Sequence, residues 1–236
     1  MSLQVAMTVG APAAKGCPPF SLAVEMTVSP GEIVGLLGPS GSGKSMTLKS
    51  IAGIMEPERG SIILYGNVLY DSSTHRNVPT RERRVGYLFQ SYALFPHMTI
   101  LQNVMSGIAR DRAESYGQWK KRAHQIAMEY LSMVKMDAFA PQNPLRVSGG
   151  QQQRVAIARL LASQPLAILL DEPFSSLDNE LKDAIDADLK PALLSAHCPV
   201  VFVSHNQEEV KRYCSRTICI GEGALGNPYA EPRCTP

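Results

Sequence analysis

The sequence of 236 residues lacks any apolar run long enough to cross a membrane. Its longest apolar stretch, residues 155–170, is interrupted by Arg159 and Pro165, whereas a membrane-spanning helix needs about 20 consecutive apolar residues. The N-terminus also lacks a basic segment followed by an apolar one, which is the pattern of a secretory signal peptide. These two absences predict a chain that neither spans a membrane nor carries an export signal.

Cysteine and excess charge are also scarce. The five cysteines are odd in number and form no C-x-x-C pair, which argues against a disulfide framework and against a zinc site. A reducing cytoplasm is the simple inference from this pattern. The formal net charge is only +2, so nothing predicts a basic surface for nucleic acid or a strongly acidic partner.

Short apolar segments alternate with longer helical ones along the chain, which predicts an α/β fold with a largely parallel sheet. Residues 20–28 alternate apolar and polar side chains like a half-buried strand, and residues 33–37 form a short apolar run typical of a buried strand. Residues 61–70 are typical of a hairpin. Residues 100–139 are rich in helix-forming residues and lie between two α/β parts, so we expect an inserted helical subdomain.

Residues 38–45, which read Gly-Pro-Ser-Gly-Ser-Gly-Lys-Ser, match the pattern G-x-x-x-x-G-K-[ST] in full, after a predicted strand and at the start of a predicted helix. The glycines let several backbone N–H groups point at phosphates, and the helix N-terminus adds partial positive charge. Lys44 then reaches the β- and γ-phosphates of ATP, and Ser45 offers a hydroxyl to Mg²⁺. A dinucleotide-binding turn is the alternative, but its glycine spacing differs and it leaves Lys44 and Ser45 unexplained. We assign ATP contacts in this phosphate loop to Gly38, Pro39, Ser40, Gly41, Ser42, Gly43, Lys44 and Ser45, and to Met46 after it.

Two adjacent acids, Asp171 and Glu172, follow the apolar strand predicted at residues 166–170. Ligands of open α/β sheets bind beyond the carboxyl ends of the strands. Asp171 is therefore expected to hold Mg²⁺, and Glu172 to orient or deprotonate the attacking water. The two acids could instead cap the next helix, but the complete phosphate loop favours the catalytic interpretation.

A phosphate loop alone is compatible with GTPases, kinases, helicases and transporter motors. Residues 147–154, Val-Ser-Gly-Gly-Gln-Gln-Gln-Arg, resemble the signature sequence of the ATP-binding cassette (ABC) family. Physically the segment is a second anion cradle at a helix start, and Ser148 can at the same time cap that helix. In the family this cradle closes on the γ-phosphate of ATP held by the other protomer. The resemblance therefore implies ATP contacts by Ser148, Gly149, Gly150 and Gln151.

The resemblance extends over roughly residues 20–222. Gln90 matches the family's Q-loop glutamine, which contacts Mg²⁺ and the water. Asp178, in residues 175–178, matches the D-loop that crosses the dimer interface, and His205 matches the switch histidine that contacts the γ-phosphate. The resemblance thus implies a catalytic set of Glu172, His205 and Gln90, a metal set of Ser45, Gln90 and Asp171, and ATP contacts by Gln90, Asp178 and His205.

Residues 83–86 and 94–99 resemble the importer branch of the family, where this region helps to receive the membrane subunit. The combination is most similar to ATPases of molybdate and related oxyanion importers, and more distantly to those for sulfate, iron, polyamines and sugars. It implies a peripheral ATPase at the cytoplasmic face of the inner membrane. Its implied partners are a second copy of itself, two membrane-spanning permease subunits and, indirectly, a solute-binding protein, with no nucleic acid.

The implied fold class is α/β, a P-loop NTPase ABC cassette with a RecA-like core, an antiparallel β part and an inserted helical subdomain. We expect residues 1–236 to form one ATP-binding domain, with the helical subdomain at about 100–157 and no C-terminal regulatory domain. One departure concerns adenine, because importers often have an aromatic residue near the position of Lys15, and Phe20 is the nearest here. Two alternatives remain: a non-transport cassette, and a regulatory nucleotide binder without turnover, against which Glu172 argues.

Overall fold

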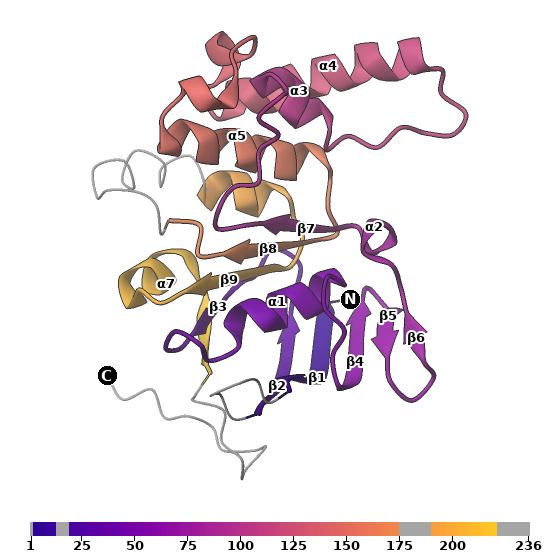
Figure 1. The fold of residues 1–236 in the computed structure, drawn as a ribbon, viewed down its shortest axis with the longest axis vertical. Helices are drawn as coiled ribbons and strands as arrows, with labels where there is room; N and C mark the ends of the chain where they lie inside the picture. The colour runs from indigo at the N-terminus through magenta and orange to yellow at the C-terminus, as the bar shows by residue number, and fades with distance from the viewer. Residues whose placement is uncertain (1, 13–18, 175–189, 221–236) are drawn as a thin grey trace. The chain divides into compact units, whose positions relative to one another are not determined.

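The computed structural model of the protein describes residues 2–12, 19–174 and 190–220 (Figure 1). No helix in these ranges is both long enough and apolar enough to cross a membrane. The D-loop residues 175–178, including Asp178, lie outside the described residues.

The chain divides into two compact units. Unit 1 consists of Met1–Tyr87, Leu166–Glu172 and Cys198–Pro236, and unit 2 of Leu88–Pro165 and Pro173–His197. The phosphate loop and the acids after the predicted strand belong to unit 1, whereas the signature segment belongs to unit 2. Each unit is therefore described by itself.

Unit 1 contains an antiparallel sheet of five strands in the order β2-β1-β4-β5-β6. Its strands are β1 (Leu3–Ala11), β2 (Phe20–Val28), β4 (Arg59–Leu64), β5 (Asn67–Asp71) and β6 (Arg76–Asn77). The alternation read in residues 20–28 is real, because Val24, Met26 and Val28 are buried while the side chains between them are exposed. The hairpin between β4 and β5 turns at Tyr65 and Gly66, which both have positive φ, as a tight two-residue turn requires.

A second sheet of five strands has the order β10-β3-β9-β8-β7. Its strands are β3 (Ile33–Leu37), β7 (Val85–Leu88), β8 (Ala167–Asp171), β9 (Val200–Ser204) and β10 (Arg216–Cys219). Strand β9 runs parallel to both β3 and β8, and every residue of β8 and β9 is buried, as their continuous apolar sequences predict. In this register Leu37 pairs with Ser204 and Asp171 with Val203, so three strand ends meet at one edge.

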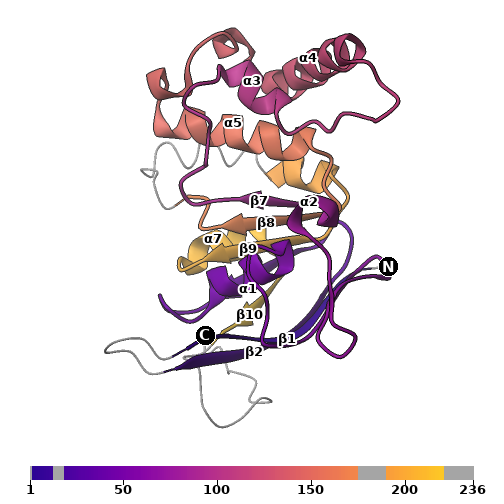
Figure 2. The ribbon, with the colours of Figure 1, turned by 45° about the vertical axis from the view of Figure 1, so that its right-hand side comes forward.

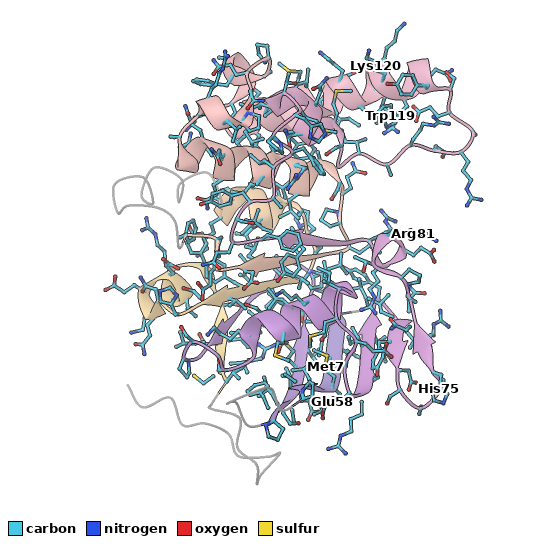
Figure 3. The ribbon with its side chains drawn as sticks, in the orientation of Figure 1. Met7, Glu58, His75, Arg81, Trp119 and Lys120 are labelled. Carbon is cyan, nitrogen blue, oxygen red and sulfur yellow. The ribbon has the colours of Figure 1, made fainter. Side chains whose placement is uncertain are left out.

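Helix α1 (Lys44–Ala52) packs against strands of both sheets. Its residues Leu48 and Ile51 share one hydrophobic core with side chains of the two sheets, including Met7 of β1, which is labelled in Figure 3. Helix α7 (Gln207–Tyr213) packs against β3 and β9. The helix that begins at the phosphate loop is therefore held by burial of its apolar face rather than by helix propensity alone.

The C-terminal end of α1 is fixed by a buried arginine from α2 (Thr80–Arg83). Arg83 is 1% exposed, and its guanidinium donates to the carbonyl oxygens of Ser50 and Ile51, to that of Val78 and to Asn77 Oδ1. These bonds satisfy carbonyls that a helix end leaves unpaired, and a positive charge there complements the helix dipole. Arg83 thus joins α1 to the segment that leads into β7.

Unit 2 is built around three helices, α3 (Ile100–Met105), α4 (Tyr116–Met133) and α5 (Gly149–Ala162), which lie side by side (Figure 2). Each begins with a capping box, in which the N-cap side chain of Thr99, Ser115 or Ser148 pairs with a glutamine three residues later. Two short 3-10 helices, η1 (Asp137–Phe139) and η2 (Pro144–Arg146), connect α4 to α5. Unit 2 contains residues 100–157 and extends beyond them on both sides.

Three strands were missed in the sequence. Strand β1 alternates as clearly as β2 does, so its pattern could have been found, whereas β6 has only two residues and β10 only four, half of them exposed. A strand this short carries too few positions to reveal a period of two. Pairing with longer neighbours, β5 and β3 respectively, is what makes these segments strands.

The cysteines depart from the expectation drawn from their number. Cys198 and Cys214 carry free thiols, whereas Cys219 is disulfide-bonded. An odd count leaves one thiol over, but it does not prevent others from pairing, because pairing depends on how closely two sulfur atoms approach in the fold. Burial raises the pKa of the Cys198 thiol to about 11, so this thiol is protonated and unreactive at neutral pH.

Candidate functional site

The phosphate loop connects the carboxyl end of β3 to the N-terminus of α1, as the sequence predicted. Gly41 and Gly43 have φ values of 83° and 94°, a region that favours glycine. At Gly43 a Cβ atom would also lie 2.7 Å from Leu22 Cδ2 and 2.9 Å from the ring of Phe20. Glycine is therefore required at residue 43 both by backbone conformation and by the close approach of β2.

Lys44 turns its ammonium group back into the loop. Its Nζ donates to the carbonyl oxygens of Gly38, at 2.7 Å, and Pro39, at 2.8 Å, and the residue is only 5% exposed. Burial lowers the pKa of Lys44, and the nearby charges of Glu172 and Asp171 act in the opposite direction. Because an ammonium group has three N–H donors, one remains for an anion bound in the loop.

The start of α1 is free to receive an anion. Gly43 provides no side-chain cap, and no acidic residue occupies the first turn. The Ser42 hydroxyl oxygen is buried and has no hydrogen-bond partner within the described part of the chain. Unpaired amides, a buried unpaired hydroxyl and a lysine at a helix N-terminus together fit a phosphate group.

Asp171, the last residue of β8, lies beside the phosphate loop. Its Oδ1 accepts a hydrogen bond from Ser45 Oγ at 2.8 Å, and its Oδ2 accepts one from Tyr87 Oη at 2.7 Å. The Ser45 hydroxyl and the Asp171 carboxylate are hard oxygen donors of the kind that Mg²⁺ prefers. These residues therefore fit a Mg²⁺ ion that would share its remaining coordination with phosphate and water.

Glu172 comes directly after Asp171 and has a left-handed backbone, with φ of 47°. Such a conformation costs a non-glycine residue on the order of 1 kcal/mol, so the surrounding structure must hold it. The Glu172 N–H donates to the carbonyl oxygen of Val203 at 3.0 Å, and its Oε1 lies 3.4 Å from His205 Nδ1. The turn thus brings the candidate base and the switch histidine together beyond the carboxyl ends of β8 and β9.

The signature segment in unit 2 begins α5. Ser148 Oγ accepts from the Gln151 N–H at 3.3 Å, and Gln151 Oε1 accepts from the Ser148 N–H at 3.0 Å. Ser148 and Gly149 are exposed, Gly150 is buried, and a Cβ atom at Gly149 would meet no atom within 4 Å. The segment therefore presents an open surface while its own helix start is already capped.

The structure separates the predicted site residues into groups. The phosphate loop, Asp171, Glu172 and His205 lie together in unit 1, whereas Gln90 and the signature residues belong to unit 2. Gln90 is exposed and follows β7 by two residues. The Met46 side chain packs against the hydrophobic core, so only its backbone can contribute to the helix N-terminus.

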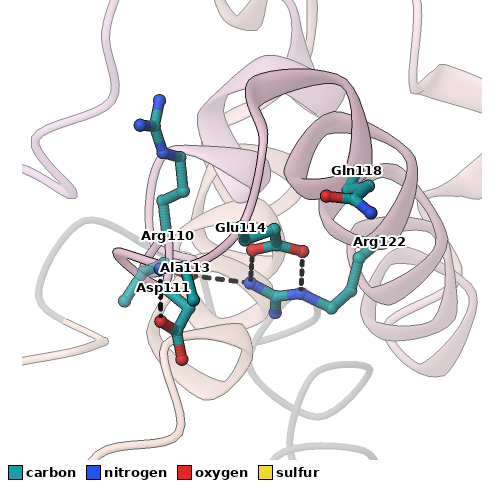
Figure 4. A pocket seen from close by; sticks show the side chains of 7 residues that line it. Arg110, Asp111, Ala113, Glu114, Gln118 and Arg122 are labelled. Atoms are coloured by element: carbon teal, nitrogen blue, oxygen red, sulfur yellow. Dashed lines mark hydrogen bonds and ion pairs between the residues drawn. The ribbon is translucent and has the colours of Figure 1, made fainter.

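A separate cavity of about 710 Å³ lies in unit 2, in the loop between α3 and α4 (Figure 4). Two of its four charged residues are paired with each other, because both carboxylate oxygens of Glu114 accept hydrogen bonds from Arg122. Arg122 also donates to the carbonyl oxygen of Ala109. The candidate site is better identified from the phosphate loop than from this cavity.

The sequence was compared with known protein families. The sequence pattern of the family described as ABC transporter matches residues 22–175. The chain belongs to the ABC transporter family.

Curated members of the ABC transporter family include close relatives of the chain. It is 40% identical over 204 residues to the sulfate/thiosulfate import ATP-binding protein CysA of Methylococcus capsulatus, covering 86% of this chain and 56% of that protein. It is 38% identical over 204 residues to the molybdenum import ATP-binding protein ModC of Mycobacterium tuberculosis, covering 86% of this chain and 55% of that one. The chain therefore spans little more than half the length of these relatives.

Solved ABC cassettes share the fold. The dimeric structure of the bacterial ABC transporter cassette MJ0796 is 31% identical and superimposes with a TM-score of 0.75, covering 96% of this chain and 97% of that one. The same protein is similar in a post-hydrolysis state bound to ADP and phosphate. The predicted fold class, an α/β ABC cassette with a parallel core sheet, an antiparallel β part and a helical segment, is confirmed.

Two residues near the phosphate loop of this ABC cassette were not predicted to lie at the site. Sequence reasoning assigned no role to Tyr87, yet its hydroxyl donates a hydrogen bond to Asp171. Phe20 was named only as the aromatic residue nearest to the position expected to stack on adenine; it is half-buried, and its ring lies against Gly43. One weak sequence signal could have pointed to Tyr87: a tyrosine in a short apolar strand needs a hydrogen-bond partner for its hydroxyl when the ring is buried.

Proposed function

We propose that the chain is the ATP-binding and ATP-hydrolysing subunit of an ABC importer. The observation that carries the proposal is the meeting of an uncapped glycine-bordered helix start, Lys44, and the Asp171–Glu172 pair at one edge of a parallel sheet. Two findings support the same activity. The chain is similar to proteins that are named import ATP-binding proteins, and to a cassette whose structure was solved with ADP and phosphate.

In this proposal the phosphates of ATP are held by the loop amides, by Lys44 and by the Ser42 hydroxyl. Mg²⁺ would be held by Ser45, Asp171 and Gln90, and when bound it would neutralise part of the charge on the phosphate oxygens. The helix start needs little rearrangement for this task, because it has no side-chain cap and two of the three Lys44 N–H donors are used by loop carbonyls, which leaves one for phosphate.

Glu172 is the proposed general base. It accepts a proton from the attacking water as the new bond to the γ-phosphorus forms, while the bond to the oxygen bridging the β- and γ-phosphates breaks, giving ADP and phosphate. His205, whose Nδ1 lies 3.4 Å from Glu172 Oε1, contacts the γ-phosphate and orients the base. Gln90 would help to hold Mg²⁺ and the water, and would link hydrolysis to the helical subdomain.

The active assembly is proposed to be a dimer of this chain. Ser148, Gly149, Gly150 and Gln151 of one copy cover the ATP bound by the other, and Asp178 crosses the interface between them. Two permease subunits receive the motion at the cytoplasmic face of the inner membrane, and a solute-binding protein acts on the other side. Residues 1–236 act as one ATP-binding domain in this assembly.

The proposed solute is molybdate or a related oxyanion. The similarity to both a sulfate/thiosulfate and a molybdenum import protein supports an oxyanion without choosing between them. Sulfate is therefore the first alternative, and iron, polyamines and sugars follow. A cassette that acts outside transport is the remaining alternative.

Glu172→Gln tests the activity. It should retain ATP affinity but lower the hydrolysis rate by about 10²–10⁴-fold, because the amide cannot accept the proton of water. Steady-state phosphate release and nucleotide titration measure the two effects, and size-exclusion chromatography with ATP should show a trapped dimer. Glu208→Gln, an exposed acid on α7, is the matched control and should hydrolyse normally. Normal turnover in Glu172→Gln would remove this residue from the base role.

Measuring the uptake of labelled solutes by cells tests which solute is transported. In cells whose only copy carries Glu172→Gln, entry of labelled molybdate should fall while entry of iron and a polyamine continues. Loss of sulfate entry instead would keep the motor role and correct the solute. Normal entry of all four would contradict the oxyanion assignment.

A further inference from the structure

We infer that Tyr87 is a positioning residue for the cation site: its hydroxyl holds one oxygen of Asp171 so that the other oxygen and Ser45 are presented to Mg²⁺. The inference rests on the proposed function, because it assigns a role within the same ATP site. It assigns to β7 a part in the chemistry that sequence reasoning did not predict.

The carboxylate of Asp171 is held at both ends. Ser45 Oγ donates to Oδ1 at 2.8 Å and Tyr87 Oη donates to Oδ2 at 2.7 Å, while Asp171 itself is only 8% exposed. The last torsion of an aspartate is broad, so one hydrogen bond alone would let the carboxylate plane turn. Two donors on opposite oxygens fix the plane, and each oxygen keeps a further lone pair for a ligand.

The hydroxyl of Tyr87 is a dependable donor. Its Oη lies 2.7 Å from Asp171 Oδ2, and its ring is partly buried, so the hydroxyl is held in place by packing as well as by the bond. A serine or water in this place could rotate or exchange, whereas the tyrosine ring packs against the hydrophobic core.

Orientation matters because the protein supplies few ligands. Among the described residues no group of three or more His, Cys, Asp or Glu side chains could hold a metal ion. A site for Mg²⁺ would then depend on one carboxylate, one hydroxyl, Gln90 and oxygens of the substrate and water. Misalignment of Asp171 removes a large part of what the chain contributes, since partners that orient metal ligands commonly affect affinity by 10–100-fold.

Tyr70, a second tyrosine of unit 1, has a hydroxyl with a purely structural role and can be compared with Tyr87. Tyr70 is 4% exposed and its Oη donates to the carbonyl oxygen of Pro57 at 2.8 Å, away from Asp171 and the phosphate loop. The hydroxyls of Tyr70 and Tyr87 donate hydrogen bonds of nearly the same length within the same unit. Loss of either hydroxyl should disturb the fold similarly, but only Tyr87 is bonded to a candidate metal ligand.

The experiment compares Tyr87→Phe with Tyr70→Phe. Binding of Mn²⁺ to the ATP-loaded full chain is measured by electron paramagnetic resonance, and ATP binding is measured separately in EDTA. We expect Tyr87→Phe to weaken Mn²⁺ binding about tenfold and to raise the Mg²⁺ concentration for half-maximal hydrolysis similarly, with ATP binding in EDTA unchanged. Tyr70→Phe should leave all three measurements near wild type.

A thermodynamic cycle with Asp171→Asn separates positioning from a general structural effect. If Tyr87 acts through Asp171, Tyr87→Phe should weaken Mn²⁺ binding no further in the Asp171→Asn background. Wild-type Mn²⁺ affinity in Tyr87→Phe, or an equal loss in Tyr70→Phe, would overturn the inference while leaving the proposed function intact. Failure of the wild-type chain to bind ATP in EDTA would instead overturn the proposed function and the inference together.

Discussion

The two helices that begin at glycine-containing anion cradles, α1 and α5, start in opposite ways. Helix α1 begins at Gly43, which has a left-handed backbone and no side chain to cap the amides. Helix α5 begins at Ser148, whose capping box with Gln151 satisfies amide groups within the same chain. The first amides of α1 therefore have no side-chain cap, whereas the capping box of α5 already satisfies an amide at its start.

The difference suits the proposed division of labour, in which one chain binds ATP at α1 and offers α5 to the ATP of a second copy. The open start of α1 can bind phosphate without breaking any hydrogen bond, which suits the first contact with ATP. Ser148 Oγ is an acceptor in its capping box, so its own proton remains available to an outside acceptor. A capped and exposed segment suits the proposed role of a surface that contacts the nucleotide bound by a partner copy.

Among the substitutions that test the contrast between α1 and α5, Lys44→Ala should have the largest effect, which is on ATP affinity. Hydrogen bonds to a charged group are worth about 1.5–3 kcal/mol, so ATP affinity should fall roughly 10–100-fold while α5 is untouched. Isothermal titration with ATP measures the change. Lys49→Ala, in the last turn of the same helix, is the matched control and should bind ATP normally. Unchanged affinity in Lys44→Ala would contradict the assignment of the phosphate loop.

Gly43→Ala and Gly149→Ala should have the next largest effects, and these effects on stability should differ in sign. Gly43→Ala places a Cβ atom against Leu22 and Phe20 at a φ of 94°, and should lower the free energy of unfolding by about 1–3 kcal/mol. Gly149→Ala meets no neighbour and should raise stability by up to about 1 kcal/mol, since alanine suits a helix better than glycine. Urea unfolding without nucleotide measures both. Equal destabilisation by the two changes would show that the cradles are built alike.

Ser148→Ala should have the smallest effect. Loss of an N-cap side chain costs about 1 kcal/mol, so the midpoint of urea unfolding of the nucleotide-free chain should fall slightly. Ser132→Ala, at an exposed position of α4, controls for loss of a serine hydroxyl and should be neutral. If Ser148→Ala were also neutral, the capping box would contribute nothing to stability in solution, and the contrast with α1 would lose its energetic basis.

The sequence alone was enough to predict the phosphate loop, the signature segment and the buried strands β3 and β8. Each is encoded in consecutive residues: glycines that permit positive φ, a serine three residues before glutamine, and unbroken apolar runs. Short-range sterics and burial then decide the local structure wherever the segment lies. The expectation for Asp171 and Glu172 followed from the same local rule about strand ends.

Only the tertiary structure decided which side chains meet. Ser45 and Asp171 are 126 residues apart in the sequence, and Tyr87 and Asp171 are 84 apart, yet each pair is joined by one hydrogen bond. Strand order and register create these contacts, and a pattern of hydrophobicity specifies neither of them. The sequence by itself determined that the chain carries a phosphate cradle and two acids at a strand end. The fold determined that a tyrosine of the edge strand holds one of those acids, because a hydrogen bond depends on distance in space.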